Sequence, residues 1–204
     1  MRIVDDEMRG YYDRRAREYD DWWHGTGLFS TRDRPGWAAE TAHLTQLLAA
    51  LAPARVLDVA CGTGFLTRHL RGEIVALDQS AQMVQVASAR MPHARVARGD
   101  AVPLPFREAA FDRIVTGHFY GHLLREERTA FVAEARRVAG ELVVVDSAQR
   151  PGVAEEEWQE RVLDDGSRHR VYKRFLTCDQ LRHELGDGDV LHEGAWFVVY
   201  RTRT

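Results

Sequence analysis

The sequence predicts an α/β fold organised around a parallel β-sheet, and three observations support this prediction. Between residues 55 and 146, short apolar segments alternate with segments of helical periodicity, which is the pattern that βαβ units produce. A glycine-rich turn follows the first of these apolar segments, at residues 60–64. The 204 residues are 45% hydrophobic, which is enough to form the core of one domain.

The expected elements follow from the positions of the apolar residues along the chain. Ser80 is placed to cap a helix, and Thr177 with Gln180 forms a capping box for another. The expected helices cover residues 8–21, 37–51, 80–90, 125–139, 154–164 and 178–185. The expected strands cover residues 55–59, 73–78, 94–101, 110–116, 141–146, 189–193 and 196–203, and a basic extended segment covers residues 168–175.

The turn after the first strand carries the most specific motif of the chain. Asp58 precedes the turn, and Gly62 and Gly64 leave its backbone bare, so that a ligand can lie directly against it. Dinucleotide-binding folds use a similar turn, but Thr67 stands here where their G-x-G-x-x-G fingerprint has its third small residue. A purely structural turn between strand and helix is the alternative.

Two further acidic residues end the second and third strands. Asp78 is placed to accept hydrogen bonds from both ribose hydroxyls of an adenosine, because nucleotide-binding folds put an acid about 20 residues after the glycine turn for this purpose. Asp100 belongs to a Gly-Asp pair, and its carboxylate suits the exocyclic amine of adenine. Three acids on consecutive strand ends are hard to explain as solvated surface, so they favour a ligand site.

These motifs resemble those of the class I S-adenosylmethionine (SAM)-dependent methyltransferases. The acid, three residues and Gly-x-Gly of that family match Asp58, Gly62 and Gly64, and residues 102–106 resemble its Leu-Pro-Phe connector. The resemblance implies SAM as cofactor and a single domain with a Rossmann-like, doubly wound sheet of seven strands, mostly parallel with an antiparallel last strand. The cofactor-binding residues that it implies are Tyr11, Tyr19, Asp58, Ala60, Gly62, Gly64, Asp78, Gln79, Met83, Asp100, Ala101 and Thr116.

The N-terminal segment carries a second resemblance. Residues 11–20 are similar to the lid helix of small-molecule methyltransferases, whose aromatic residues close over the sulfonium end of the cofactor. Aromatic faces stabilise such a cation, and their closure shields it from water. Tyr11 and Tyr19 are therefore the candidates, with simple packing onto the sheet as the alternative. The expected organisation is a lid helix and loop over residues 1–36 and a SAM-binding core over 37–204, with an acceptor-covering insertion near 151–175.

His118 and His122 are the candidate catalytic residues. They follow the fourth strand, where the methyl group should lie, and His122 matches the second histidine of the family's Leu-His-His-Leu segment, while Gly121 replaces the first. A histidine can take a proton from an acceptor because its ordinary pKa lies near neutrality. Packing is the alternative, and no metal is expected because no glutamate completes a His-Glu-x-x-His pattern. Lys173 and Arg174 could hold an acidic group of the acceptor, unless they are solvated charges at a strand edge.

The predicted function is an enzyme that transfers methyl from SAM to an O, N or C atom of a small-molecule acceptor. The alternatives are an RNA or protein methyltransferase and a non-catalytic SAM-binding partner subunit. A net charge of -3 argues against a nucleic-acid surface, and no apolar stretch approaches the ~18–20 residues of a membrane span. Two cysteines do not indicate a disulfide framework, so the expectation is a cytoplasmic monomer or homodimer.

Overall fold

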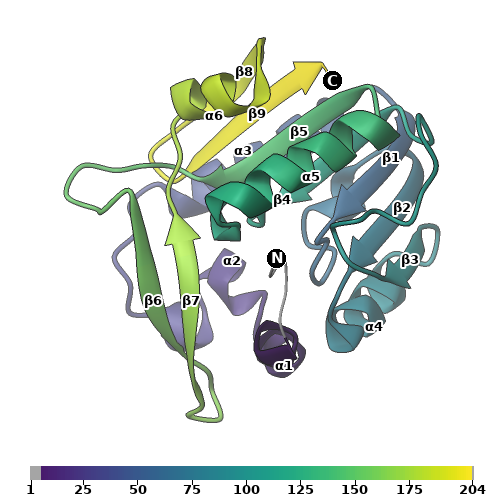
Figure 1. The fold of residues 1–204 in the computed structure, drawn as a ribbon. Coiled ribbons are helices and arrows are strands. Elements are labelled where there is room, and N and C mark those ends of the chain that lie inside the picture. Colours follow the sequence, from purple (N-terminus) through teal and green to yellow (C-terminus); the bar gives the residue numbers. More distant parts are fainter. Residues whose placement is uncertain (1–5, 204) are drawn as a thin grey trace.

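The computed structural model describes residues 6–203, and a single large sheet runs through its centre (Figure 1). Residues 1–5 of the expected N-terminal unit, and residue 204, lie outside the described residues. The strands of the sheet are β1 (Ala54–Val59), β2 (Gly72–Asp78), β3 (Arg95–Arg98), β4 (Arg113–Gly117), β5 (Glu141–Ser147), β8 (Gly188–Glu193) and β9 (Phe197–Arg203).

The order of these strands is β3-β2-β1-β4-β5-β9-β8. β1 to β5 are parallel to their neighbours, and β9 runs antiparallel to both β5 and β8. The predicted seven-stranded, mostly parallel sheet with an antiparallel last strand is therefore confirmed. The central strands are buried on both faces, which is why their sequences are almost continuously apolar.

Helices cover both faces of this sheet. They are α1 (Asp6–Arg15), α2 (Asp21–His24), α3 (Trp37–Ala50), α4 (Ala81–Arg90), α5 (Arg125–Val138) and α6 (Cys178–Leu185), with 3₁₀ turns η1 (Gly27–Phe29), η2 (Thr67–His69) and η3 (Tyr120–His122). Leu44 of α3 packs in one core cluster with Val143, while Phe131 of α5 and Leu181 of α6 pack in another with Leu57. α3 and α5 therefore lie on opposite faces (Figure 1).

The glycine turn does not lead into a full helix. Only residues 60–71 separate β1 from β2, and within them the helical conformation is limited to the single turn η2. The other helices of the core begin and end within a residue or two of their expected positions. Ser80 caps α4 by accepting a hydrogen bond from the Met83 backbone N–H, and the expected Thr177–Gln180 capping box starts α6.

The expected helix at 154–164 is wrong, because this segment is strand β6 (Glu156–Val162), which pairs antiparallel with β7 (Arg168–Arg174). The acidic strand faces the basic one, so that Glu156 lies opposite Arg174 and Glu160 opposite Arg170. Opposite charges on facing residues stabilise an antiparallel pair. The hairpin stands apart from the main sheet, beside α1 and α2 (Figure 1).

The N-terminal segment is broken where one helix, residues 8–21, was expected. α1 ends at Arg15, a turn follows, and α2 is a separate short helix. Three acids tie this segment to its surroundings: Asp13 accepts from the Ser80 hydroxyl, Asp20 accepts from the Thr63 hydroxyl, and Glu18 accepts from the backbone of Asp164. The segment thus bridges the glycine turn, the start of α4 and the hairpin. No helix within residues 6–203 is long and apolar enough to cross a membrane.

Candidate functional site

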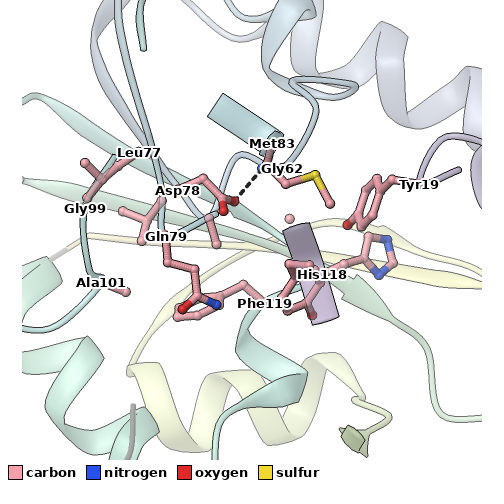
Figure 2. A pocket seen from close by; sticks show the side chains of 14 residues that line it. Tyr19, Gly62, Leu77, Asp78, Gln79, Met83, Gly99, Ala101, His118 and Phe119 are labelled. Atoms are coloured by element: carbon pink, nitrogen blue, oxygen red, sulfur yellow. Dashed lines mark hydrogen bonds between the residues drawn. The ribbon is translucent and has the colours of Figure 1, made fainter. Parts of the chain in front are cut away.

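A cavity opens at the carboxyl ends of β1, β2 and β4, and it is called the strand-tip cavity below (Figure 2). It measures about 520 Å³ including its open mouth. Its lining consists of Tyr12, Tyr19, Val59, Ala60, Gly62, Leu77, Asp78, Gln79, Met83, Gly99, Ala101, Gly117, His118 and Phe119. β1 and β4 flank the point where the strand order reverses, which is where open α/β sheets bind ligands.

The two ends of the strand-tip cavity differ in character. Tyr19 and His118 lie together at one end, and Leu77, Gly99 and Ala101 line the other (Figure 2).

The backbone at the base of the strand-tip cavity is strained, because Ala60 at the end of β1 and His118 at the end of β4 both have positive φ, 60° and 54°. Residues other than glycine rarely adopt this backbone conformation, and those that do concentrate at functional sites.

The glycine turn follows directly after Ala60. Gly62 has a φ of 56°, and its backbone N–H donates a hydrogen bond of 2.8 Å to Asp78 Oδ2 (Figure 2). The other carboxylate oxygen of Asp78 accepts from the Ser80 backbone N–H at 2.9 Å. Burial raises the pKa of Asp78 to about 6. Each oxygen keeps a second lone pair, so the carboxylate can still accept hydrogen bonds from a ligand.

A smaller cavity adjoins the first and shares Tyr19, Ala60 and Gly117 with it. Asp58 lines this second space, which we call the Asp58 cavity. Asp58 Oδ2 accepts a hydrogen bond from the Thr67 hydroxyl, whereas Oδ1 is buried and has no hydrogen-bond partner among the described residues. Burial raises the pKa of this carboxyl to about 7. An unpaired, buried carboxylate oxygen is suited to a cationic or hydrogen-bond-donating group of a ligand.

His118 separates the strand-tip cavity from the aromatic side chains of α2. Its ring lies edge-on to Trp22 and Trp23, with centroids 4.6 and 4.9 Å away. Its Nδ1 is 3.4 Å from Ser147 Oγ and 3.9 Å from the carboxylate of Asp146, while Nε2 is buried without a partner among the described residues. Burial lowers the pKa of His118 to about 3, against the opposing effect of Asp146. The ring is therefore neutral, and the carboxylate favours the tautomer with the proton on Nδ1.

Asp146 forms a buried ion pair behind His118. The Lys173 ammonium lies 2.5 Å from Asp146 Oδ1, and the backbone N–H groups of Gly121 and Ser147 also donate to this carboxylate. Burial alone would raise the pKa of Asp146, but the Lys173 charge outweighs it and holds the pKa at about 2. His122 lies nearby, and its Nδ1 donates to the Tyr172 carbonyl at 2.6 Å. These contacts fasten β7 to the end of β4 and to β5.

Residues 56–141 match the sequence model of a family described as a methyltransferase domain. The demethylmenaquinone methyltransferase of Thermotoga maritima is 33% identical over 111 residues, 50% of this chain and 48% of that protein. The chain spans about half the length of the curated relatives that it matches. A solved complex of DhpI with S-adenosylhomocysteine (SAH) is 26% identical, with a TM-score of 0.73 over 97% of this chain and 96% of that one. A complex titled DhpI-SAM-HEP, 24% identical, shares the fold with a TM-score of 0.74 over 99% of both chains.

Residues 56–141 thus resemble a methyltransferase domain, and the fold over nearly the whole chain resembles that of DhpI. Most of the residues expected to bind cofactor in this chain meet at the two cavities. Tyr19, Ala60, Gly62, Asp78, Gln79, Met83 and Ala101 line the strand-tip cavity, as does His118, and Asp58 lines the adjoining one. Their roles stay predictions, because the geometry gives their positions and not their ligand.

The other expected site residues lie elsewhere. Tyr11 is buried against Leu163 and Val171 of the hairpin. Asp100 is on the surface, with 51% of its side chain exposed, and its carboxylate pairs with Arg9 at 2.9 Å. Gly64, Thr116 and His122 line neither cavity: a Cβ on Gly64 would stand 2.7 Å from Met91, Thr116 donates to the Val59 carbonyl, and His122 holds the hairpin.

Sequence reasoning missed several residues of the strand-tip cavity. Tyr12, rather than its neighbour Tyr11, lines the cavity with Tyr19. Helical spacing could not have shown this, because α1 ends at Arg15 and Tyr19 lies in the turn beyond it. Phe119 follows His118 directly and could have been included by position. The remaining members, which are Val59, Leu77, Gly99 and Gly117, carry no chemical signal in the sequence.

Proposed function

We propose that this chain binds SAM across the strand-tip cavity and the Asp58 cavity and transfers its methyl group to a small-molecule acceptor. The observation that carries the proposal is a pair of buried carboxylates, Asp58 and Asp78, at adjoining cavities of the sheet's switch point. One of them keeps an unpaired oxygen, and the other is anchored to the glycine turn. The match of residues 56–141 to a methyltransferase domain and the overall similarity to the SAH complex of DhpI support the same function.

The residues present fit both ends of SAM. Asp78 would accept the ribose hydroxyls, and the apolar end of the strand-tip cavity, with Leu77, Gly99 and Ala101, would take the adenine ring. The unpaired Asp58 Oδ1 would bind the ammonium of the methionine portion. Gly62 has no Cβ. A Cβ built on it would stand 3.5 Å from the Tyr19 ring, in the space between the glycine turn and the N-terminal segment.

When bound, SAM supplies a methyl group on a sulfonium, which a nucleophilic atom of the acceptor takes up in an in-line displacement. The protein's contribution is alignment and exclusion of water. Tyr12 and Tyr19 offer π faces to the cationic end, and His118 Nε2 offers a hydrogen-bond acceptor to the substrate. Residues 6–36 and the β6–β7 hairpin would act as the lid and the acceptor cover.

The first test is SAH binding measured by calorimetry. Asp78→Asn should weaken SAH binding by about 1–3 kcal/mol, because the variant loses a charged acceptor for the ribose. Asp112→Asn is the matched control, since Asp112 is an exposed carboxylate that pairs with Arg55 at the opposite edge of the sheet. Equal affinity for SAH in wild type and Asp78→Asn would contradict the assignment, and so would tight NAD binding without SAH binding.

The acceptor class is tested by label transfer. The protein is incubated with SAM carrying a labelled methyl group and with separate pools of small molecules, RNA and protein. The label is expected in the small-molecule pool. Label in RNA or protein would contradict the small-molecule assignment, and tight SAM binding without transfer to any pool would identify a non-catalytic subunit.

A further inference from the structure

A large cavity lies on the far side of His118 from the strand-tip cavity. It measures about 1,120 Å³ including its open mouth, and it is enclosed by the loop before α3, the end of β5 and the β6–β7 hairpin. Its walls carry the cationic side chains of Arg32, Arg34, Arg150, Arg161 and Lys173. We call it the arginine-lined cavity.

Four of these five cations have no carboxylate partner. No acid among residues 6–203 forms an ion pair with Arg32, Arg34, Arg150 or Arg161. Arg34 donates to the Trp22 carbonyl at 3.0 Å and lies 3.9 Å above the Trp37 ring. Arg161 donates only to the side chain of Gln159.

The acids of the same wall offset only part of this charge. Glu160 pairs with Arg168, outside the cavity lining, and Glu157, which accepts a hydrogen bond from the neutral Gln159 amide, leaves one negative charge against the four arginines. Lys173 is neutralised by Asp146. Burial lowers the pKa of Arg34, Arg150 and Arg161, which means that their guanidinium charges are partly desolvated without a compensating anion. The cavity therefore holds an excess of positive charge that the chain itself does not neutralise.

The arginine-lined cavity adjoins the proposed methyl-transfer position. His118 lines the strand-tip cavity, and its ring contacts Trp22 while its Nδ1 lies 3.4 Å from Ser147 Oγ. Trp22 and Ser147 both line the arginine-lined cavity. His118, together with the Trp22 and Ser147 side chains that it contacts, thus separates the two spaces. An acceptor anchored on one side of His118 can present a reacting atom on the other.

We propose that the arginine-lined cavity binds the anionic group of the methyl acceptor, a carboxylate or phosphate on a small molecule with an apolar portion. This inference rests on the proposed function and specifies its substrate class. The planar guanidinium presents paired N–H donors that match the oxygens of such anions. The rings of Trp37, Trp158 and Trp196 provide flat apolar surface for the rest of the molecule. Lys173 and Arg174, the cations expected from the sequence, are instead paired with Asp146 and Glu184.

Tryptophan fluorescence provides the test, because four tryptophans line the cavity: Trp22, Trp37, Trp158 and Trp196. The full chain is titrated with phenyl phosphate, benzoate and the neutral benzyl alcohol, with and without saturating SAH. We expect both anions to change the fluorescence saturably and the neutral probe to bind at least about tenfold more weakly. The stronger of the two anions identifies the acceptor's acidic group. Equal affinity for the neutral probe would overturn the inference.

Two variants on different elements assign the binding to the arginines. Arg161→Gln on β6 and Arg150→Gln after β5 should each weaken anion binding by about tenfold, the effect of removing a charged hydrogen bond. Arg95→Gln is the control, because it removes the same charge from an exposed position on β3. Unchanged anion affinity in both cavity variants would overturn the inference. SAH binding is measured on the same samples: its absence refutes the proposed function, whereas SAH binding without anion binding refutes this inference alone.

Discussion

Four ionisable side chains at or just after the carboxyl ends of the strands have pKa values shifted toward their neutral forms. Burial raises the pKa of Asp58 to about 7 and that of Asp78 to about 6, while it lowers the pKa of His118 to about 3 and that of His122 well below its ordinary value. The common cause is desolvation, which penalises the charged form of acids and bases alike. Groups shifted in this way concentrate at functional sites, which agrees with the position of three of them at the two cavities.

The lowered pKa of His118 changes the catalytic role that can be expected of this residue. The sequence predicted a general base with a pKa near 6.5, but a ring with a pKa of about 3 is a weak proton acceptor. Its buried Nε2 is better suited to accept a hydrogen bond from an acceptor molecule and so to orient it. The catalytic assignment of His118 and His122 stays a prediction.

The protonation state of His118 can be measured directly by ¹⁵N NMR of its ring. At pH 5.5 we expect a neutral imidazole with the proton on Nδ1, because burial opposes the cation and Asp146 faces Nδ1. His118→Gln identifies the signal, and free histidine in the same buffer serves as the reference that is mostly protonated. A His118 ring that becomes protonated near pH 6.5 would restore the role of a general base.

At the scale of elements, the β6–β7 hairpin shows where a local pattern is insufficient. Residues 154–164 are rich in glutamate, glutamine and arginine, all good helix formers, and their spacing predicted a helix. The structure instead pairs Glu157 with Lys173 and Glu160 with Arg170 across the hairpin. Whether a segment forms a strand depends on the strand that it faces. Here the facing strand is the basic β7, which lies outside residues 154–164 and so does not enter a reading of that segment alone. The sequence therefore could not reveal the cavity that this hairpin closes.

The N-terminal segment is the element whose stability should depend most on ligand. Within residues 8–20, its contacts with the core run largely through single polar side chains, such as Asp13 with Ser80 at 2.6 Å and Asp20 with Thr63 at 2.6 Å, whereas Trp23 of α2 packs in the core with Phe65. Segments with few buried apolar contacts open at low free energy. Tyr12 and Tyr19 line the strand-tip cavity, so a ligand there would add contacts to both.

Hydrogen exchange should therefore slow in residues 8–20 when SAH is added. α6 is the internal control, because it packs through Leu181 and Leu185 into the core on the opposite face from α3, and its residues do not line the strand-tip cavity. Exchange in α6 should be the same with and without SAH. Unchanged exchange in residues 8–20 at saturating SAH would show that the segment is already part of the stable core and does not act as a lid.

At the scale of the whole molecule, the sheet was the part that the sequence predicted best. Strands such as β1 and β5 are buried on both faces, so their apolar runs are visible without knowledge of their neighbours. The parallel topology places Asp58 and Asp78 at the same edge, which made the site predictable as well. Asp100 lies beyond the short strand β3, where the chain has left the sheet, and its carboxylate pairs with Arg9 at the surface. The arginine-lined cavity draws residues from distant segments, and no local motif marks it.

The same buried groups affect the pH dependence of the whole protein's stability. Asp58 and Asp78 have raised pKa values in the folded state, so their contribution to stability increases as pH falls from about 7 toward about 4. His118 has a lowered pKa, so its contribution is present above pH 6.5 and is lost as pH falls toward about 3. The pKa of His122 is lowered as well, so its contribution changes with pH in the same direction. Between pH 7 and pH 5 the two effects oppose each other. Two carboxyls bind protons on folding while two imidazoles release them.

Asp58→Asn should change the pH dependence of stability, and the raised pKa of Asp58 gives the direction of the change. At pH 8 the wild type buries an ionised Asp58, a cost that the variant avoids, whereas at pH 5 both side chains are neutral. The free energy of unfolding of Asp58→Asn, relative to wild type, should thus be higher at pH 8 than at pH 5, with a slope of up to about 1.4 kcal/mol per pH unit. Urea denaturation at pH 5, 6, 7 and 8 measures it. Asp112→Asn is the control, because salt-bridged Asp112 has a lowered pKa and stays ionised throughout this range. If the difference in unfolding free energy between Asp58→Asn and wild type does not change with pH, Asp58 is ionised from pH 5 to pH 8 and its surroundings compensate the charge.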